Sequence, residues 1–167
     1  MQEKYNEFIR IAIHLNKKLS ITPLLYGSLG LQQLVAEELF PEDIDILIPG
    51  EFIKEKWINF KELIESIGYH LEDLHEHGFL YGRYKIAFSF IEDLREYAKI
   101  FEEDIKTIID KEAKYKVLDL DQYLRVYERS INDNYRKEKN NNKDIEKIRI
   151  IKAEITKKRQ LTHASTL

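Results

Sequence analysis

Apolar residues recur along the first part of the chain with two periods, one helical and one extended. Helical spacing runs through residues 3–19 and again through 52–67. Between them, a short apolar run over 21–26 ends at Gly27 and predicts a strand. The stretch 29–39, rich in Leu, Gln and Glu, predicts a helix. Helices and strands are therefore mixed within one stretch of chain.

Side chains of two kinds alternate over residues 43–48. Asp43, Asp45 and Leu47 fall on one face of the predicted strand, and three isoleucines fall on the other. This pattern is typical of a strand that is buried on one side. Both aspartates therefore project from the same face.

Turns are concentrated in the first half, because all six glycines and all three prolines lie before residue 83. Beyond residue 69 we expect a β-rich stretch that turns at Gly82, and later a hairpin that turns at 110–113. The segments that carry these expectations are 69–91 (strands), 93–101 (helix), 105–118 (hairpin), and 121–139 and 144–159 (helices).

Length and composition fit this division. The chain has 167 residues, 43% of them hydrophobic and 34% charged, which is enough apolar material for one folded domain. We predict an α+β fold with an α/β core over 1–118 and a helical segment packed on it over 119–159. The last residues, 160–167, are expected to form a flexible tail.

Several classes of protein are excluded by what the sequence lacks. It has no cysteine, which rules out disulfides, thiolate zinc sites, iron–sulfur clusters and cysteine nucleophiles. No apolar run approaches the roughly 20 residues of a membrane span. The N-terminal residues lack the apolar core of a signal peptide. We therefore expect a soluble cytoplasmic protein with no membrane association.

Charge is nearly balanced overall but unevenly distributed. The 30 Asp and Glu stand against 27 Lys and Arg, a formal net charge of −3, which argues against nucleic acid as the main partner. Residues 132–159 nevertheless hold ten Lys and Arg and five Asp and Glu. This basic segment is either a solvated helical face or a wall that faces a polyanion, such as a nucleoside triphosphate, across a cleft.

Candidate chemistry gathers where a predicted strand ends in Gly27-Ser28 and a helix begins. Glycine lets the backbone turn sharply and approach a ligand, and the first N–H groups of a helix favour phosphate. Ser28 can cap that helix or bind a phosphate oxygen. On the next strand, Asp43 and Asp45 repel each other unless a cation lies between them, and Mg²⁺ prefers carboxylate and phosphate oxygens. Together these residues predict a metal-assisted phosphate site.

The pattern of Gly27-Ser28, fourteen intervening residues and Asp43-Ile44-Asp45-Ile46 resembles the signature of the nucleotidyltransferase superfamily, which has the fold of the DNA polymerase beta palm. Within it the chain is most similar to the small aminoglycoside and lincosamide nucleotidyltransferases. Arg136 and Lys143-Asp144 in the C-terminal helices are similar to a further pattern of that family. The resemblance covers roughly residues 20–150.

This resemblance implies a mixed β-sheet flanked by helices, with an added C-terminal helical segment. It also implies an enzyme that binds a nucleoside triphosphate with Mg²⁺ or Mn²⁺ and transfers a nucleotidyl group to a hydroxyl of a small molecule or a protein. Asp43 and Asp45 match the catalytic, metal-binding carboxylates. Gly27 and Ser28 match the phosphate-binding turn, and Lys143 matches a nucleotide-binding lysine. The acceptor, the preferred nucleotide and the oligomeric state do not follow from these motifs.

The chain departs from the family at the third carboxylate, which normally lies on a later strand. The corresponding strand here is 84–90, and Ala87 or Ser89 stands at the expected place. Neither residue binds a metal strongly or acts as a base at neutral pH. Either another residue takes over the role, or the chain is a degenerate member that serves as a binding or regulatory module, for example a toxin–antitoxin partner.

The segment His75-Glu76-His77 precedes this strand and offers titratable substitutes. If the hairpin turns at Tyr81-Gly82-Arg83, His77 lies opposite Ala87. If it turns at Gly82-Arg83 alone, the register shifts and Glu76 lies opposite Ser89. Glu76 and His77 are therefore the candidate catalytic substitutes. Two alternatives stay open: an exposed hairpin with polar surface residues, and a zinc site formed by His75, Glu76 and His77.

Overall fold

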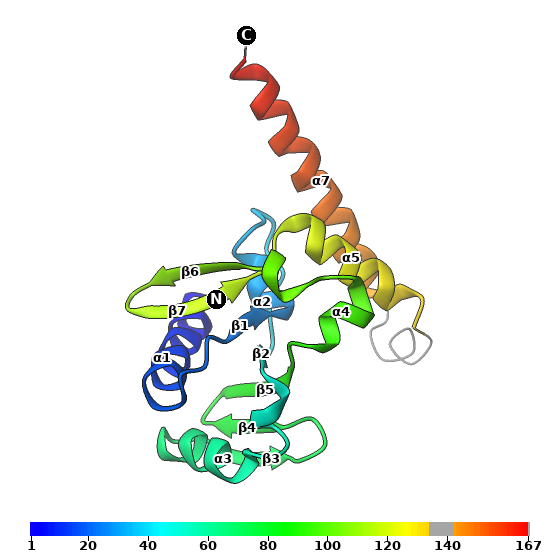
Figure 1. Ribbon diagram of the computed structural model, residues 1–167. Coiled ribbons are helices and arrows are strands. Elements are labelled where there is room, and N and C mark those ends of the chain that lie inside the picture. The colour runs from blue at the N-terminus through cyan, green and yellow to red at the C-terminus, as the bar shows by residue number, and fades with distance from the viewer. Residues whose placement is uncertain (134–141, 167) are drawn as a thin grey trace.

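The computed structural model describes residues 1–133 and 142–166, and a seven-stranded mixed sheet runs through it (Figure 1). The strand order is β3-β4-β5-β2-β1-β7-β6. The pairs β1–β7 and β2–β5 are parallel, and the other neighbouring pairs are antiparallel. The strands are β1 Leu24–Tyr26, β2 Ile44–Ile48, β3 His70–Asp73, β4 Gly78–Tyr81, β5 Tyr84–Phe90, β6 Lys106–Asp110 and β7 Ala113–Val117.

Six α-helices of the described residues pack around this sheet (Figure 1). They are α1 Gln2–Leu19, α2 Gly27–Gln32, α3 Trp57–Ser66, α4 Asp93–Ala98, α5 Leu120–Ile131 and α7 Lys143–Ala164. Single turns of 3₁₀ helix occur at Gly50–Phe52 and Glu102–Asp104. The α+β prediction is confirmed at this level: a mixed sheet carries helices on its faces, and helices follow it at the C-terminal end.

One face of the sheet is sealed by α1 and α3. Phe60 of α3 meets Phe88 of β5 edge to face, with ring centroids 4.8 Å apart. At the edge of this layer, the hydroxyl of Tyr5 donates to Asp110 over 2.6 Å and lies at the same distance from the hydroxyl of Tyr115. The side chains of α1 that are buried in this layer are Phe8, Ile9, Ile11, Ala12 and Leu15. The result is one continuous apolar core.

The opposite face is covered by α4, α5 and α7 over only part of its area. Leu47 of β2 is buried there with Leu24 of β1 and Tyr123 of α5, in a second apolar cluster. On β5, Ala87 is half-buried and Ser89 is exposed. The prediction that β2 is buried on one side alone is therefore wrong at Leu47, because helices from distant parts of the sequence cover that end of the strand.

The helix expected over 29–39 is much shorter, because α2 ends at Gln32. The side chain of Gln32 is buried and binds the backbone beyond the helix. Its amide nitrogen donates to the carbonyl oxygen of Glu37 over 3.0 Å, and its oxygen accepts from the N–H of Leu39 over 2.6 Å. A side chain that binds the backbone in this way competes with a further helical turn. The residues up to β2 form a loop instead.

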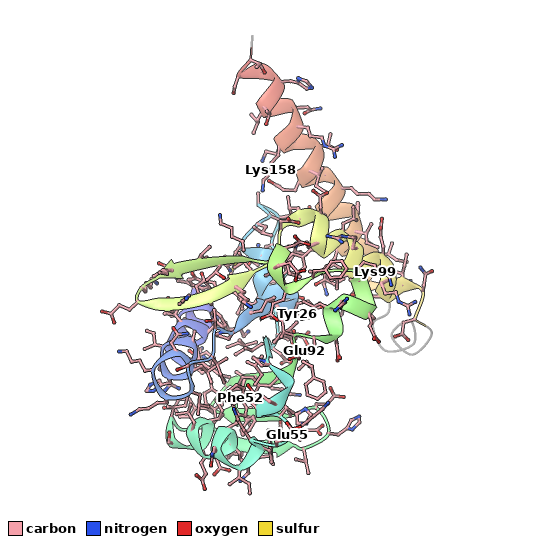
Figure 2. The ribbon with its side chains drawn as sticks, viewed as in Figure 1. Tyr26, Phe52, Glu55, Glu92, Lys99 and Lys158 are labelled. Atoms are coloured by element: carbon pink, nitrogen blue, oxygen red, sulfur yellow. The ribbon has the colours of Figure 1, made fainter. Side chains whose placement is uncertain are left out.

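Helix ends differ from the predictions at further places, and α4 and α5 end at Ala98 and Ile131, before the predicted ends at 101 and 139. The helix expected over 52–67 begins at Trp57, after the 3₁₀ turn. Helix α7 continues to Ala164, so residues 160–164 of the segment predicted to be a flexible tail are helical. Residues 156–166 are all exposed, and α7 projects from the body of the protein there, as Lys158 marks in Figure 2.

The two predicted hairpin turns are confirmed. β6 and β7 are joined at 110–113, and β4 and β5 are joined at Gly82, which has a φ of +56°. Arg136 and most of the asparagine run at 140–142 lie outside the described residues. Within the described residues, no helix has both the length and the apolar character needed to cross a membrane.

Candidate functional site

The register of three central strands gathers the residues of the Gly-Ser and Asp-x-Asp motifs. Tyr26, the last residue of β1, is paired with Asp45 of β2, so the Gly27-Ser28 turn begins beside that aspartate. On the other side of β2, Asp45 is paired with Ala87 of β5. Antiparallel pairing of β1 with β2 therefore brings together two motifs that are separated by fourteen residues in the sequence.

Gly27 in this turn lies directly against the side chain of Asp45. Its φ is +66°, a left-handed conformation that favours glycine. A Cβ atom at this position would lie 2.2 Å from Oδ2 of Asp45. The turn therefore needs glycine for its conformation and for the space that the carboxylate occupies. The close approach is to the Asp45 carboxylate, and the predicted approach to a phosphate ligand stays a prediction.

Two cavities lie over these residues, and we call them together the cleft. The outer lobe has a volume of about 500 Å³ and the inner lobe about 400 Å³. Both lobes are lined by Ser28, Asp43, Asp45 and Lys147. The outer lobe adds, among others, Glu37, Glu38, Leu39, Phe40, Glu42 and Ile150. The inner lobe adds, among others, Tyr26, Glu76, Ala87, Ser89, Tyr127 and Asp144.

Lys147 of α7 brings a positive charge to the cleft. Its Nζ lies 3.6 Å from Oδ1 of Asp144 and 5.0 Å from the ring centroid of Tyr127. Asp144 is buried and accepts a hydrogen bond from the hydroxyl of Ser130 on α5. A carboxylate and an aromatic ring therefore hold the ammonium group in place from α5 and α7.

Lys143, the lysine that matched the family pattern, lies at the rim. Its Nζ is 3.8 Å from Oε1 of Glu42, and its side chain is 66% exposed. It lines the outer lobe and not the inner lobe. Lys147, one helical turn further along α7, lines both lobes, and the sequence analysis did not single it out.

Stacked tyrosine rings connect the sheet to the cleft. The centroids of Tyr26 and Tyr123 are 6.4 Å apart, and those of Tyr123 and Tyr127 are 6.1 Å apart. Tyr26 lies near the middle of the molecule in Figure 2. Burial raises the pKa of Tyr123 and Tyr127 well above the ordinary value, and the neighbouring tyrosines and Asp45 add to the effect. These phenols stay neutral, so the charge in this part of the cleft belongs to the carboxylates and Lys147.

Glu76 lies beside the place where the family pattern lacks its third carboxylate. Tyr81 is paired with Tyr84, so the hairpin turns at Gly82-Arg83 alone. This is the predicted alternative that sets Glu76 opposite Ser89. Glu76 lines the inner lobe together with Ala87 and Ser89.

The structure does not bring the two neighbouring histidines to the aspartates. Residues 74–77 form a turn instead of a strand, so the alternation assumed for them does not apply. His77 has a φ of +48°, and its ring meets Trp57 edge to face with centroids 5.5 Å apart. Burial lowers the pKa of His77. His75 and His77 line a smaller cavity of about 160 Å³ and neither lobe of the cleft.

The oxygen ligands of the cleft fit a cation that also binds phosphate. Asp43 and Asp45 supply two carboxylates, and within residues 1–133 and 142–166 no group of three or more His, Asp or Glu is placed to hold a metal. The zinc site considered for His75, Glu76 and His77 is therefore not formed. Mg²⁺ usually takes one or two carboxylates and completes its shell with water and substrate phosphates. The pair Asp43 and Asp45 is enough for such a site.

Lys147, Tyr123 and Tyr127 were not assigned to the site from the sequence, but they share one kind of signal with Asp144, which the family pattern had named. Asp144 and Lys147 are three residues apart, and Tyr123 and Tyr127 are four apart, so each pair lies on one face of its helix. Both tyrosines are buried, as packing residues are. Spacing alone could not show which of several charged helical faces turns toward the cleft.

Comparison with known proteins gives one informative match. No family model matches the chain, and no solved structure matches it. The uncharacterized protein YnaI of Bacillus subtilis (strain 168) is 48% identical over 147 residues, which cover 88% of this chain and 94% of YnaI. The name of YnaI states no activity.

Proposed function

The chain belongs to the same family as YnaI, and from its cleft we propose that it is a metal-dependent nucleotidyltransferase. It transfers a nucleotidyl group from a nucleoside triphosphate to a hydroxyl of a small molecule or a protein. The resemblance of the Gly-Ser and Asp-x-Asp motifs to that superfamily supports this reaction class.

One observation carries the proposal: the two lobes of the cleft share Ser28, Asp43, Asp45 and Lys147. The carboxylates suit a divalent cation, and the hydroxyl and ammonium groups suit phosphate oxygens. A reaction between two substrates needs a common centre with room on either side. The shared residues provide the centre, and the outer and inner lobes provide the room.

Each residue has a defined task in this proposal. Asp43 and Asp45 hold the cation, which when bound neutralises charge on the phosphates. Lys147 and the hydroxyl of Ser28 bind phosphate oxygens, and Gly27 leaves the space in which the Asp45 carboxylate lies against the turn. Helix α2 has only six residues, so we assign the phosphate contacts to these groups and not to a helix dipole.

The chemical step is an in-line displacement at the α-phosphorus. The acceptor oxygen forms a bond to that phosphorus, the bond to the bridging oxygen breaks, and pyrophosphate leaves. The proton of the acceptor hydroxyl passes to the carboxylate of Glu76. Glu76 lines the inner lobe beside Ala87 and Ser89, which makes that lobe the acceptor side.

A second candidate function is favoured by Ala87. Ala87 of β5 is the strand partner of Asp45, and its methyl group stands where the family pattern has a third carboxylate. A chain without that carboxylate can bind nucleotide without turnover and act as a binding or regulatory module. The two functions differ in the role of Glu76, which is a base in the enzyme and has no task in the module.

Thermal unfolding with Mg²⁺ and a nucleoside triphosphate tests the site. A ligand that binds only the native form at about 100 times its Kd adds roughly 2.7 kcal/mol, which is a clear shift in Tm. Asp45→Asn should abolish the shift while leaving the metal-free protein at least as stable, because it removes a like charge. Glu62→Gln on α3, an exposed carboxylate of the opposite face, is the matched control and should keep the shift.

Transfer of label from [α-³²P]ATP to an extract fraction separates the enzyme from the module. Glu76→Gln should lose transfer by about 10²–10⁴-fold, the usual contribution of a general base, while keeping the shift in Tm. Binding without any transfer by the unaltered protein would support the module. A Tm that no divalent cation or triphosphate changes would contradict both functions.

A further inference from the structure

Phe40 lies at the outer lobe in a conformation that is unusual for its residue type. Its side chain is 74% exposed, and its φ is +49°, in the left-handed region. Bulky residues rarely adopt this conformation, which costs free energy unless the surroundings impose it. Exposure of a large apolar ring is a second cost. Packing in the fold explains neither feature.

The backbone is anchored on both sides of Phe40. Before it, the N–H of Leu39 donates to the buried side chain of Gln32 over 2.6 Å. After it, Pro41 is buried, and its carbonyl oxygen accepts from Nζ of Lys4 over 2.9 Å. The ring is therefore held at the cleft by fixed neighbours, so ligand binding needs little further ordering of this segment.

Apolar and polar groups divide the outer lobe. Leu39, Phe40 and Ile150 supply apolar surface, and the shared residues Ser28 and Lys147 line the same lobe. A ligand that fits this lobe has a flat apolar part and an anionic part. A nucleoside triphosphate has both, with the base at one end and the phosphates at the other.

We propose that the outer lobe binds the nucleoside of the triphosphate, with its base stacked on the ring of Phe40. This inference rests on the proposed nucleotidyltransferase function and adds which lobe holds which reactant. The inner lobe, where Glu76 lies, is left for the acceptor. Stacking on an aromatic ring tolerates every base, because every base has a flat face.

The charges around the ring agree with this orientation. Glu37, Glu38 and Glu42 line the outer lobe with Phe40. Glu37 is paired with Arg149 and Glu42 with Lys143, and the carboxylate oxygens can accept hydrogen bonds from amino groups of a base. Lys147 lies at the junction with the inner lobe, since it lines both. The base therefore points to the carboxylates and the triphosphate to the lysine.

Isothermal titration in Mg²⁺ tests the inference with two probes: the α,β-methylene analogues of the four common nucleoside triphosphates, and inorganic tripolyphosphate. Phe40→Ala should weaken the binding of the analogues by roughly 5- to 150-fold, which is the usual effect of removing one stacking ring. Binding of tripolyphosphate, which has no base, should not change. Phe40→Tyr should restore the affinity for the analogues, because it keeps a ring.

Phe40→Gly controls for folding. Glycine adopts a φ of +49° without strain, so this variant should melt at the same or a higher temperature than the original protein. It should nevertheless lose affinity for the analogues as Phe40→Ala does. If Phe40→Gly is at least as stable as the original protein but binds the analogues more weakly, misfolding does not explain the lost affinity.

The possible failures are distinguishable. If Phe40→Ala binds the analogues as tightly as the original protein does, the nucleoside is not stacked on this ring, and the proposed function stands. If Phe40→Ala weakens the binding of tripolyphosphate as much as that of the analogues, Phe40 affects the binding of phosphate and not of the base. The inference is then overturned. If the original protein binds neither probe, the proposed function fails and the assignment of the lobes fails with it.

Discussion

The two faces of the central sheet use the same strands for different purposes. On the face covered by α1 and α3, Ile86 and Phe88 of β5 are completely buried. On the other face of that strand, Ala87 is half-buried and Ser89 is exposed at the inner lobe. Successive residues of one strand point to opposite faces. Neighbouring positions can therefore serve stability and chemistry separately, and substitutions can tell the two faces apart.

The largest expected effect on stability lies on the closed face. Phe88→Ala removes a ring that packs on Phe60 and Phe79, and we expect it to cost about 3–5 kcal/mol of unfolding free energy. Ser89→Ala, the next position on the open face, should change stability by less than about 0.5 kcal/mol. Urea denaturation measures both. Equal losses would contradict the division between the faces.

The second prediction concerns Gly30 under α5. A Cβ atom there would lie 2.6 Å from the carbonyl oxygen of Leu25 and 2.1 Å from the hydroxyl of Tyr123. Gly30→Ala should therefore cost about 1–3 kcal/mol, because backbone and a buried ring must both move. Gly82→Ala meets no atom within 4 Å and carries only the strain of a positive φ. A larger loss at Gly82 than at Gly30 would refute this assignment.

The third prediction adds a carboxylate to the open face. Ala87→Asp places a third acidic group beside Asp45, at the position of the strand that the family pattern leads us to expect. Without metal it should destabilise the protein by up to about 1 kcal/mol through like-charge repulsion. With Mg²⁺ it should increase the shift in Tm, since an additional ligand tightens binding. Ala87→Asn is the control, and an equal Mg²⁺ shift in both variants would argue against a cation site.

The smallest effect concerns pH at the border of the closed face. Burial lowers the pKa of His77 below its ordinary value of 6.5, so the unfolded chain binds that proton more tightly than the folded protein. Neutral His77 therefore contributes fully to the free energy of unfolding above pH 6.5. This contribution is lost as the pH falls from 6.5 to the lower pKa of the folded protein. His77→Asn, which tolerates the positive φ, should flatten the stability profile in that range. A profile that keeps its slope in His77→Asn would contradict this assignment.

Periodic patterns determined most of the elements by themselves. The helix near the N-terminus, the strand after Glu42, the turn at Gly82 and the hairpin at 110–113 all follow from residue spacing and turn chemistry. Such signals are local, because the period of the apolar residues and the conformational freedom of glycine belong to the segment itself. The motif at Gly27-Ser28 and Asp43/Asp45 was visible for the same reason.

Only the tertiary structure decided which residues complete the cleft. Lys147, Asp144 and Phe40 come from segments whose local sequence favours a solvated helix or a loop. Their positions depend on α5 and α7 packing over β2, and on the buried side chain of Gln32, which ends α2 early. The sequence likewise left two hairpin registers open for Glu76, and strand pairing selected one of them. These are contacts between residues far apart in the chain, and their energies do not follow from local periodicity.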